Sequence, residues 1–447
     1  MGNKIYRTLS LATVVLLLLG LGITGREAHA QDSWLIYVTT TEDLRDFELN
    51  SNCSVGQPMG GPCSLRAAIY EASHFTLEPV KIMLPPGEYK LTRAEPGYEG
   101  EEEDHYGDLD FPDLADGKHT YIRIIGTGGR NPSVIDANFI DRVMEIGKNQ
   151  RVSLENLVLK NGFAGGVYNP YGGGLKVYEA SVELYNVRLT NNKAQGQFGL
   201  YPSYGGGIYS EKSYLRLEDC ELDHNTSDAS SAIHMKDNNW TTIILSSTIH
   251  HNIVSEYDTF AGHIHLENEL IMTNSTMSDN QGGDFNIVSD APALIQHSIL
   301  ISSGELGSID SQSGDLKLWF NILQVIPIPG DNQGIVCSVP FISRPSLGGN
   351  IFSDESCTPG ANDAVYPYSD MFLGPLGNYG GITPTIPLRP DSPAVNYKIF
   401  DCTNAYGQRL WIDQREKSRN DYRCDPGSFE LQAGEDPTAL YLPAIAR

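Results

Sequence analysis

Two histidines occupy matching places in a repeated pattern, and this spacing could create a metal site. His234 and His265 each stand between two apolar residues, in Ile233–Met235 and Ile264–Leu266. If the repeats stack as neighbouring parallel strands, the two imidazoles lie about 4.8 Å apart and could share a transition metal. No carboxylate of the pattern completes the ligand shell, so a solvated pair of rings is the alternative.

A second candidate for cation binding is the densest acidic cluster, Glu101–Asp110. Asp108 and Asp110 are its last members, and carboxylate oxygens are the ligands that Ca²⁺ prefers. The segment lacks the spacing of a dedicated calcium loop, and a solvated surface loop is the alternative. Ca²⁺ is the cofactor that the sequence allows, and no other is predicted.

Three tyrosines could form a ligand-binding surface. Tyr171 and Tyr204 stand directly before glycine-rich triplets, and Tyr209 follows the second triplet. Aromatic rings combine a large apolar face with a polar tip, which suits stacking on sugar rings. The alternative is that the same rings pack the loops onto the fold.

No catalytic residue is identified. Enzymes that cleave polysaccharides use clustered acids with a basic residue, or two carboxylates facing one bond. In stacked repeats we expect no outward column with acids on adjacent repeats, and the best pair is Glu221 with Asp223, near Arg188. Asp136 and the Asp141–Arg142 pair are interpreted as structural ion pairs between repeats. Motifs such as GxSxG, HExxH and the P-loop are absent from the sequence.

The elements that would position these residues are repeats of one phrase, apolar-x-apolar-x-x-small-x-apolar-x-x-Asn. It occurs in Val182–Asn192, Leu215–Asn225, Thr242–Asn252 and Leu270–Asn280, with a looser copy in Ser153–Gly162. Repeats of this length with alternating apolar residues indicate a solenoid of stacked coils. The closing asparagines, Asn192, Asn225, Asn252 and Asn280, are predicted to stack in a hydrogen-bonded column, since an amide both donates and accepts.

Small residues precede the first strand of each coil. They occur before Leu175, Ile208, Ile233, Ile264 and Phe285, each of which begins a triplet with its middle residue outward. The predicted outward column is Lys176, Tyr209, His234, His265 and Asn286, beside Tyr178, Glu211, Lys236, Glu267 and Val288.

The seven cysteines suggest an oxidising compartment. Proximity in sequence predicts three disulfides, Cys53–Cys63, Cys337–Cys357 and Cys402–Cys424. Cys220 remains and occupies the small inward slot that Val187, Ser247 and Ser275 fill in other repeats. We interpret it as a buried free thiol.

The N-terminus and the charge limit where the protein acts. Residues 1–30 combine basic residues, an apolar run and an Ala-x-Ala site, which predicts a secretory signal peptide. The net charge of −25 argues against a nucleic-acid partner. We expect a secreted or cell-surface protein without a transmembrane segment after signal cleavage, whose partner is an extracellular polymer or a cell-envelope component.

Both ends of the chain resemble known bacterial secreted proteins. CSLRAAI (63–69) with IMLPPGEYKLT (82–92) resembles the CSLREA-type N-terminal domain, although Ala67 replaces the glutamate of that motif. LGGNIFSDESC (347–357), LGPLGNYGGITPTIPLRPDSPAVN (373–396) and DQREKSRNDYRCDPGSFE (413–430) resemble the choice-of-anchor Q module, and the repeats are similar to those of polymorphic outer-membrane proteins. The resemblance implies a right-handed parallel β-helix of the pectin-lyase-like kind, exported from the cell, without an established activity.

The expected fold is therefore all-β, a right-handed parallel β-helix with an N-terminal capping α-helix and a loop-rich, disulfide-containing C-terminal module. The predicted segments are the signal peptide (1–30), the cap and first coils (31–120), the central coils (121–325), the C-terminal module (326–432) and a tail (433–447). The leading hypothesis is a non-catalytic module that binds extended ligands such as glycans. The alternatives are a polysaccharide lyase or glycoside hydrolase on the same fold, and a structural surface spacer.

Overall fold

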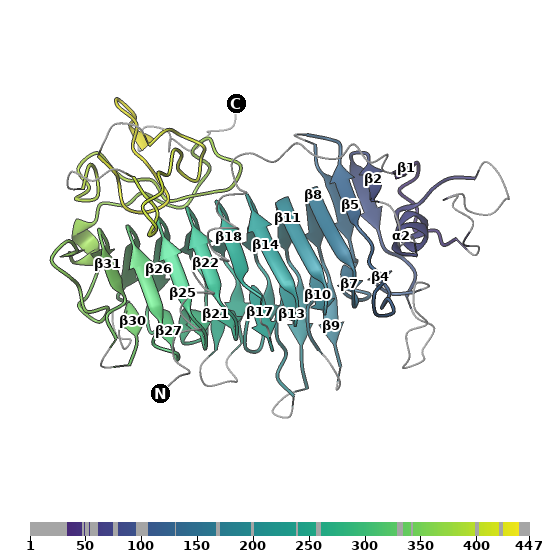
Figure 1. Ribbon diagram of the computed structural model, residues 1–447, viewed down its shortest axis with the longest axis horizontal. Coiled ribbons are helices and arrows are strands. Elements are labelled where there is room, and N and C mark those ends of the chain that lie inside the picture. The colour runs from purple at the N-terminus through teal and green to yellow at the C-terminus, as the bar shows by residue number, and fades with distance from the viewer. Residues whose placement is uncertain are drawn as a thin grey trace, which may run out of the picture.

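The computed structural model is a parallel β-helix, which confirms the predicted fold class (Figure 1). It describes residues 34–46, 49, 53, 61–74, 79–94, 106–129, 131–166, 170–197, 201–237, 240–255, 261–328, 334–340, 343–397, 402–419 and 423–437. The predicted signal peptide, the acids at 101–104 and the last residues of the tail lie outside these ranges. No helix within them is long and apolar enough to cross a membrane.

Each coil contributes strands to as many as three parallel sheets, which we name sheets A, B and C. Sheet A contains β1 (Trp34–Tyr37), β2 (Val80–Leu84), β3 (Gly87–Lys90), β5 (Ile122–Gly126), β6 (Ser133–Asp136), β8 (Arg151–Lys160), β11 (Ser181–Thr190), β14 (Tyr214–Glu218), β15 (Glu221–Asp223), β18 (Thr242–Leu245), β19 (Thr248–His250), β22 (Leu270–Thr273), β23 (Thr276–Ser278), β25 (Ala293–Gln296), β26 (Ile299–Ser303), β28 (Leu316–Trp319), β29 (Ile322–Ile326), β31 (Ser346–Gly348), β32 (Ile351–Phe352) and β33 (Ala364–Val365).

Sheet B contains β4 (Leu109–Phe111), β7 (Met144–Ile146), β10 (Leu175–Tyr178), β13 (Ile208–Glu211), β17 (Ile233–Lys236), β21 (Gly262–Leu266), β24 (Phe285–Ser289), β27 (Gly307–Ser311) and β30 (Cys337–Ser338). Sheet C contains β9 (Phe163–Gly165), β12 (Lys193–Gln195), β16 (Thr226–Ser227) and β20 (Ile253–Val254). The sequence pattern predicted the strands of sheets A and B in the coils that it marked, between residues 153 and 287. It missed sheet C, because two or three residues are too few to show an alternation.

The predicted asparagine column is present at the corner that follows sheet A. The Nδ2 atoms of Asn192, Asn225 and Asn252 each donate to Oδ1 of the next asparagine, at 3.0, 3.0 and 3.1 Å. Each amide also donates to a backbone carbonyl of the preceding coil, as Asn280 does to Ile249. The side chains are buried, so the column satisfies polar groups that water cannot reach.

Cys220 lies in the small inward slot at the bend of sheet A, as predicted. It is a buried free thiol, and burial raises its pKa to about 12. Its backbone N–H donates to Oγ of Ser247, and the N–H of Ser247 donates to Oγ of Ser275, at 3.0 and 3.2 Å. The slot therefore carries a second polar ladder, which the sequence pattern did not predict.

The N-terminal end of the solenoid is covered by α2 (Leu65–Ser73). The Ser64 side chain caps this helix by accepting a hydrogen bond from the backbone N–H of Ala67. Its apolar side chains Leu65, Ala68, Ile69 and Ala72 are all buried. The cap therefore forms without the glutamate of the resembled motif.

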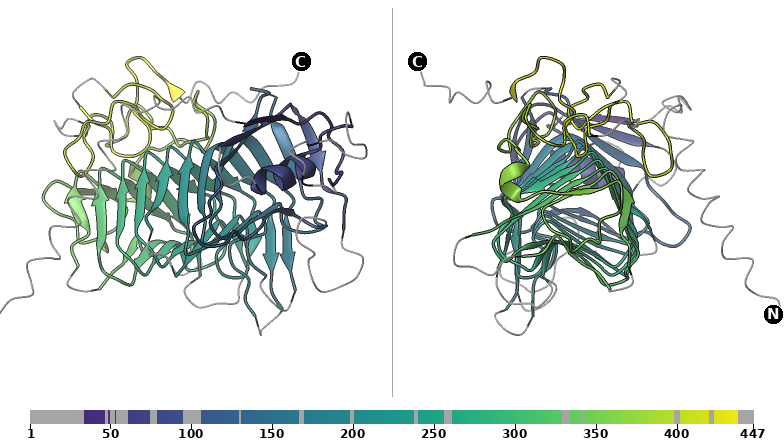
Figure 2. Two further views of the ribbon diagram at one scale, coloured as in Figure 1. Left: turned by 45° about the vertical axis from the view of Figure 1, so that its right-hand side comes forward. Right: turned by 90° about the vertical axis from the view of Figure 1, so that its left-hand side faces the viewer.

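Parallel pairing continues past residue 325, since β28 pairs with β31 and β29 with β32. The chain that follows β33 has the short helix η1 (Tyr368–Asp370) and few other regular elements. We keep the name C-terminal module for this part alone, residues 366–437 as far as described, which begins later than the expected residue 326. It folds back over the later coils of sheet A, at the end of the solenoid opposite α2 (Figures 1 and 2). All three predicted disulfides are present.

Candidate functional site

An outward column of side chains runs along sheet B. The strand register places Lys176 opposite Tyr209, Tyr209 opposite His234, and His234 opposite His265. The rings of Tyr209 and His234 are stacked at 5.5 Å between centroids, and those of His234 and His265 lie 5.1 Å apart. The prediction that these residues are neighbours is confirmed.

The two loop tyrosines join this column. Tyr171 stacks on Tyr209 with centroids 4.7 Å apart, and Tyr204 lies against His234 at 4.5 Å. Tyr209 is only 4% exposed, and its hydroxyl donates to Oε2 of Glu211. The tyrosines therefore use much of their ring surface to pack on one another, as the alternative interpretation expected, and the half-buried Tyr171 and Tyr204 face the surface more than Tyr209 does.

Tyr171, Tyr204, Tyr209, His234 and His265 line a cleft of about 610 Å³. Lys236, Glu267, Asp290 and Gln312 also line it. Nε2 of His265 lies 3.5 Å from Oδ2 of Asp290. The cleft thus combines aromatic and imidazole rings with one cation and two carboxylates, which can contact a polar ligand that also has apolar faces.

The register of the fifth coil corrects the predicted columns. His265 pairs with Val288 and Leu266 with Ser289, so Val288 and not Asn286 continues the first column. Asn286 is buried, and its Oδ1 accepts a hydrogen bond from Nδ2 of Asn280. The second column consequently passes from Glu267 to Asp290. The sequence pattern did not predict this, because it placed Phe285, after the small residues, as the first residue of the triplet.

His234 is held as a neutral base beside the cleft. Its Nδ1 lies 2.8 Å from Oγ of Ser230. Burial, followed by the nearby His265 and Lys236, lowers the pKa of His234 well below its usual value. The proposed metal between His234 and His265 gains no support from the geometry, because neither residue belongs to a three-ligand cluster within the described ranges.

Acids from adjacent coils meet at the N-terminal end of the sheet B column, and the prediction that no column carries such acids was wrong. Asp110 on β4 pairs with Glu145 on β7, and Lys176 continues the column, with Nζ 2.6 Å from Oε1 of Glu145. The triplets Leu109–Phe111 and Met144–Ile146 share the apolar-x-apolar pattern of the later coils. Extending that pattern towards the N-terminus would have found the pair.

The expected pair on sheet A, Glu221 and Asp223, is an ion-paired cluster. Nε of Arg188 lies 2.7 Å from Oδ1 of Asp223 and 3.6 Å from Oε1 of Glu221. Oδ2 of Asp223 also accepts from Thr190 Oγ1 and lies 2.6 Å from Nδ1 of His224. These contacts lower the pKa of the Asp223 carboxyl although burial raises it, so this group is a fixed anion.

Asp136 and Asp141, which were predicted to form ion pairs between coils, pair with different residues. Asp136 pairs with Nζ of Lys160 at 3.3 Å, and Asp141 with Nη1 of Arg142 at 3.5 Å. Arg142 also reaches Asp108 of the preceding coil. Within the described residues, the ion pairs of this group that join two coils are therefore Lys160 with Asp136 and Arg142 with Asp108.

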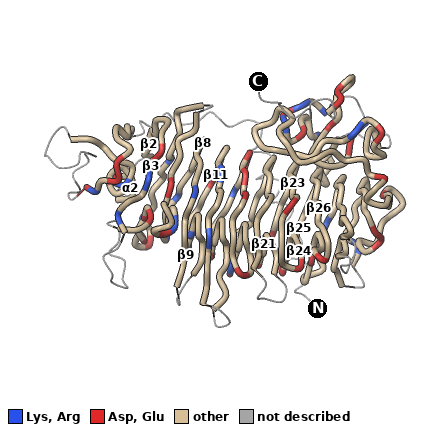
Figure 3. The backbone as a smooth tube through the Cα atoms, turned by 180° about the vertical axis from the view of Figure 1, so that it is seen from behind, with Lys and Arg blue, Asp and Glu red and all other residues tan. Residues whose placement is uncertain are grey.

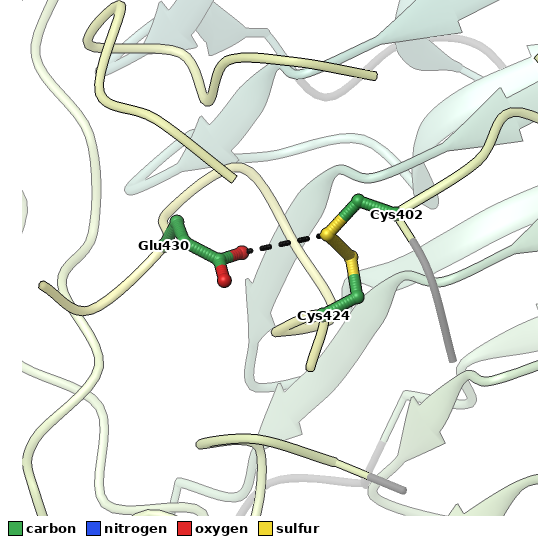
Figure 4. Close-up of side chains that lie close together, drawn as sticks. All are labelled: Cys402, Cys424 and Glu430. Carbon is green, nitrogen blue, oxygen red and sulfur yellow. Dashed lines mark hydrogen bonds between the residues drawn. A yellow bond between two sulfur atoms is a disulfide. The ribbon is translucent and has the colours of Figure 1, made fainter. Parts of the chain in front are cut away.

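A cluster of two sulfurs and a carboxylate in the C-terminal module is no metal site. Cys402 and Cys424 form a disulfide, and Oε2 of Glu430 lies 3.9 Å from Sγ of Cys402 (Figure 4). A disulfide sulfur carries no proton to donate and is a poor metal ligand. The Glu430 carboxylate is instead paired with Nη1 of Arg419 at 2.7 Å.

Comparisons with known proteins leave the family open. No protein-family model and no curated protein matches this chain. Among solved structures, Escherichia coli YbhC is 11% identical with a TM-score of 0.29, over 77% of this chain and 86% of that one. The catalytic domain of a GH87 alpha-1,3-glucanase in complex with tetrasaccharides is 11% identical with a TM-score of 0.16, over 77% and 70% of the two chains. Similarity this low adds nothing to the strand pairing described above.

Proposed function

We propose that this protein is an exported β-helix module that binds an extended carbohydrate polymer along the outer face of sheet B without cleaving it. The observation that carries the proposal is the cleft that Tyr171, Tyr204 and His265 line together with Lys236, Glu267 and Asp290. Rings offer flat apolar faces, and the charged groups offer hydrogen bonds to hydroxyls, which together suit a sugar chain.

The geometry of the solenoid favours an extended ligand. Side chains of successive coils stack at the parallel-strand spacing, so a chain lying along sheet B meets one row of contacts per coil. The three disulfides support a location outside the cytoplasm, because such bonds persist in oxidising compartments. The resemblance of both ends to secreted bacterial β-helix proteins supports the same location.

The charge of the protein indicates which polymers to test first. A net charge of −25 repels polyanions, so we expect neutral polysaccharides to bind more tightly than uronic-acid polymers.

A second candidate, a polysaccharide-cleaving enzyme, rests on the carboxylates of Glu267 and Asp290, which adjacent coils bring to one cleft together with Lys236. Catalysis by two carboxylates requires one of them to act as a general acid, usually with a raised pKa. Oε2 of Glu267 instead accepts a hydrogen bond from the backbone N–H of Asp237, and Oδ2 of Asp290 lies 3.5 Å from Nε2 of His265. Binding without cleavage is therefore the better supported function.

A glycan array combined with a product assay tests the proposal. We expect the purified protein to retain at least one neutral polysaccharide and to release neither reducing ends nor unsaturated products. Lys236→Met and Tyr171→Ala should each weaken binding at least tenfold. Lys317→Met, which changes an exposed cation on β28 of sheet A, is the matched control and should bind normally.

The other outcomes separate the alternatives. Product release that Glu267→Gln abolishes would establish the enzyme. If the protein bound no glycan and released no product, the proposal would fail and the structural spacer would be the remaining hypothesis.

A further inference from the structure

Four carboxylates gather where the first two strands of sheet B meet. Asp108 directly precedes β4 and Asp110 lies on it, while Asp141 and Glu145 come from the next coil. Oxygen atoms of Asp108, Asp110 and Glu145 all lie within 4.8 Å of one another. The cluster lies on the same sheet as the cleft but shares no residue with it.

The Asp108 carboxylate is buried in this cluster without a hydrogen-bond donor. Its side chain is 1% exposed, and neither of its oxygens accepts a hydrogen bond within the described part of the chain. Oε2 of Glu145 is also buried and accepts none. Proteins rarely leave a buried carboxylate in this condition, so a missing partner is the simplest explanation.

The basic residues nearby do not supply that partner. Nη1 of Arg142 is 4.0 Å from Oδ2 of Asp108, too far for a hydrogen bond, and is nearer to Asp141 and Glu145, at 3.5 and 3.6 Å. Lys176 is paired with the other oxygen of Glu145. Arg66 donates to the backbone carbonyls of Gly107 and Asp108 and is paired with Asp43.

We propose that Asp108, Asp110 and Glu145 bind one Ca²⁺ ion. Within the described residues, both oxygens of Asp108 and Oε2 of Glu145 are buried acceptors without a hydrogen bond, and a divalent cation can satisfy several such oxygens at once. The three ligand side chains offer oxygen alone, which selects a hard cation over zinc or copper.

The spacing of the oxygens suits this ion. Ca²⁺ lies about 2.3–2.6 Å from its ligands, so oxygens on opposite sides of it are up to about 5 Å apart. Oxygens within 4.8 Å of one another can therefore surround it after small side-chain movements. Mg²⁺ requires nearly ideal octahedral geometry at shorter distances, and this irregular cluster suits it less well.

The cluster of Glu221, Asp223 and His250 provides the contrast. There the Asp223 carboxylate is already bound by Arg188, Thr190 and His224. It has no need of a metal ion, although its ligand atoms are equally close together. We therefore use it as the internal control.

Calcium at the first site would fasten β4 to β7, and Arg66 ties the same loop to α2. An ion that binds the folded chain stabilises it by mass action. The purified protein, freed of metal with a chelator, should bind one Ca²⁺ per chain by calorimetric titration with CaCl₂. MgCl₂ should bind at least tenfold more weakly, and CaCl₂ should raise the midpoint of thermal unfolding.

Substitutions at the cluster decide whether these three residues are the ligands. Asp110→Asn and Glu145→Gln, at half-buried positions, should each weaken Ca²⁺ binding at least tenfold, and Asp108→Asn should abolish it. Glu221→Gln should bind Ca²⁺ as the parent does. If Asp108→Asn fails to fold, the other two variants still test the site. The proposal fails if the parent gives neither heat nor a shift in midpoint, or if Asp110→Asn and Glu145→Gln bind Ca²⁺ like the parent.

Discussion

The later coils of sheet A and sheet B present two different surfaces. The C-terminal module covers sheet A there, and the side chains that sheet A presents to it are neutral: Oγ1 of Thr276 donates to Oε1 of Gln414, and Nε2 of Gln414 donates to Oγ1 of Thr248. The face of sheet B that lines the cleft carries Lys236, Glu267 and Asp290. Charged columns therefore mark a face left to solvent and ligands, and neutral columns a face that the protein covers itself.

One column of sheet A shows this transition along its length. Arg188 and Glu221 are followed by Thr248 and Thr276, and then by isoleucines at 299, 322 and 351. Those isoleucines point outward from the coils but are buried against the module, with Met371, Ile386 and Phe429. Figure 3 shows basic and acidic residues interspersed along the uncovered coils. Burying charges beneath the module would cost several kcal/mol each, which explains the change of residue type.

The largest expected effect lies in the covered region. Arg419 is fully buried, pairs with Glu430 at 2.7 Å, and donates to the Gly427 carbonyl and to Oδ1 of Asn274. Arg419→Met leaves a buried carboxylate without its partner and should lower the free energy of unfolding by about 3–5 kcal/mol. Urea denaturation measures the loss. Arg389→Met, in an exposed pair with Asp391, should change it by less than about 1 kcal/mol.

The second largest effect on stability is expected in the asparagine column, at the corner that follows sheet A. Asn252→Leu removes the acceptor for the amide of Asn225 and the donor to Asn280. We expect a loss of about 1–3 kcal/mol, because buried polar groups lose their partners. Thermal and urea unfolding test this, with Asn131→Leu at an exposed position as the control. Equal stability of the two variants would contradict the structural role of the column.

Acid should weaken the attachment of the module to sheet A. His297 lies between them, with Nε2 2.8 Å from the carbonyl of Thr403, and burial together with Arg419 lowers its pKa to about 3. Below about pH 6.5 the imidazole of His297 is protonated in the unfolded chain but stays neutral in the folded chain. The free energy of unfolding therefore falls by about 1.4 kcal/mol for each pH unit of acidification. The stability difference between the parent and His297→Gln should therefore shrink between pH 6.5 and 5.5. Urea unfolding of both proteins at the two pH values measures this difference, and an unchanged difference would contradict the role of His297.

The smallest effect on stability is expected on the open face. Lys236 lines the cleft and is only half-buried, so Lys236→Met should change the free energy of unfolding by about 0.5 kcal/mol or less. The same variant should lose glycan binding. A large loss of stability would show that sheet B, like sheet A, is specialised for packing.

Much of the fold could be predicted because each repeat shows the same short-range pattern of apolar, small and asparagine residues. The alternation of Leu175–Val177 and the spacing of Asn192, Asn225 and Asn252 depend on strand geometry and hydrogen-bonding capacity, which each residue carries with it. The site was harder to predict. The sequence pattern placed the coil at Phe285 in the wrong register, so Asp290 was not predicted beside Glu267. The pattern was also not extended to the first coils, so Asp110 was not predicted to pair with Glu145.

The sequence by itself determined that the chain stacks in coils, which residues close each coil, and which cysteines pair, since these follow from short-range pattern and proximity. Only the tertiary structure decided which face of the solenoid stays open. The reason is that the module returns to coils more than a hundred residues earlier in the chain, as in the contact between Thr276 and Gln414, and a contact over that distance leaves no periodic trace in the sequence.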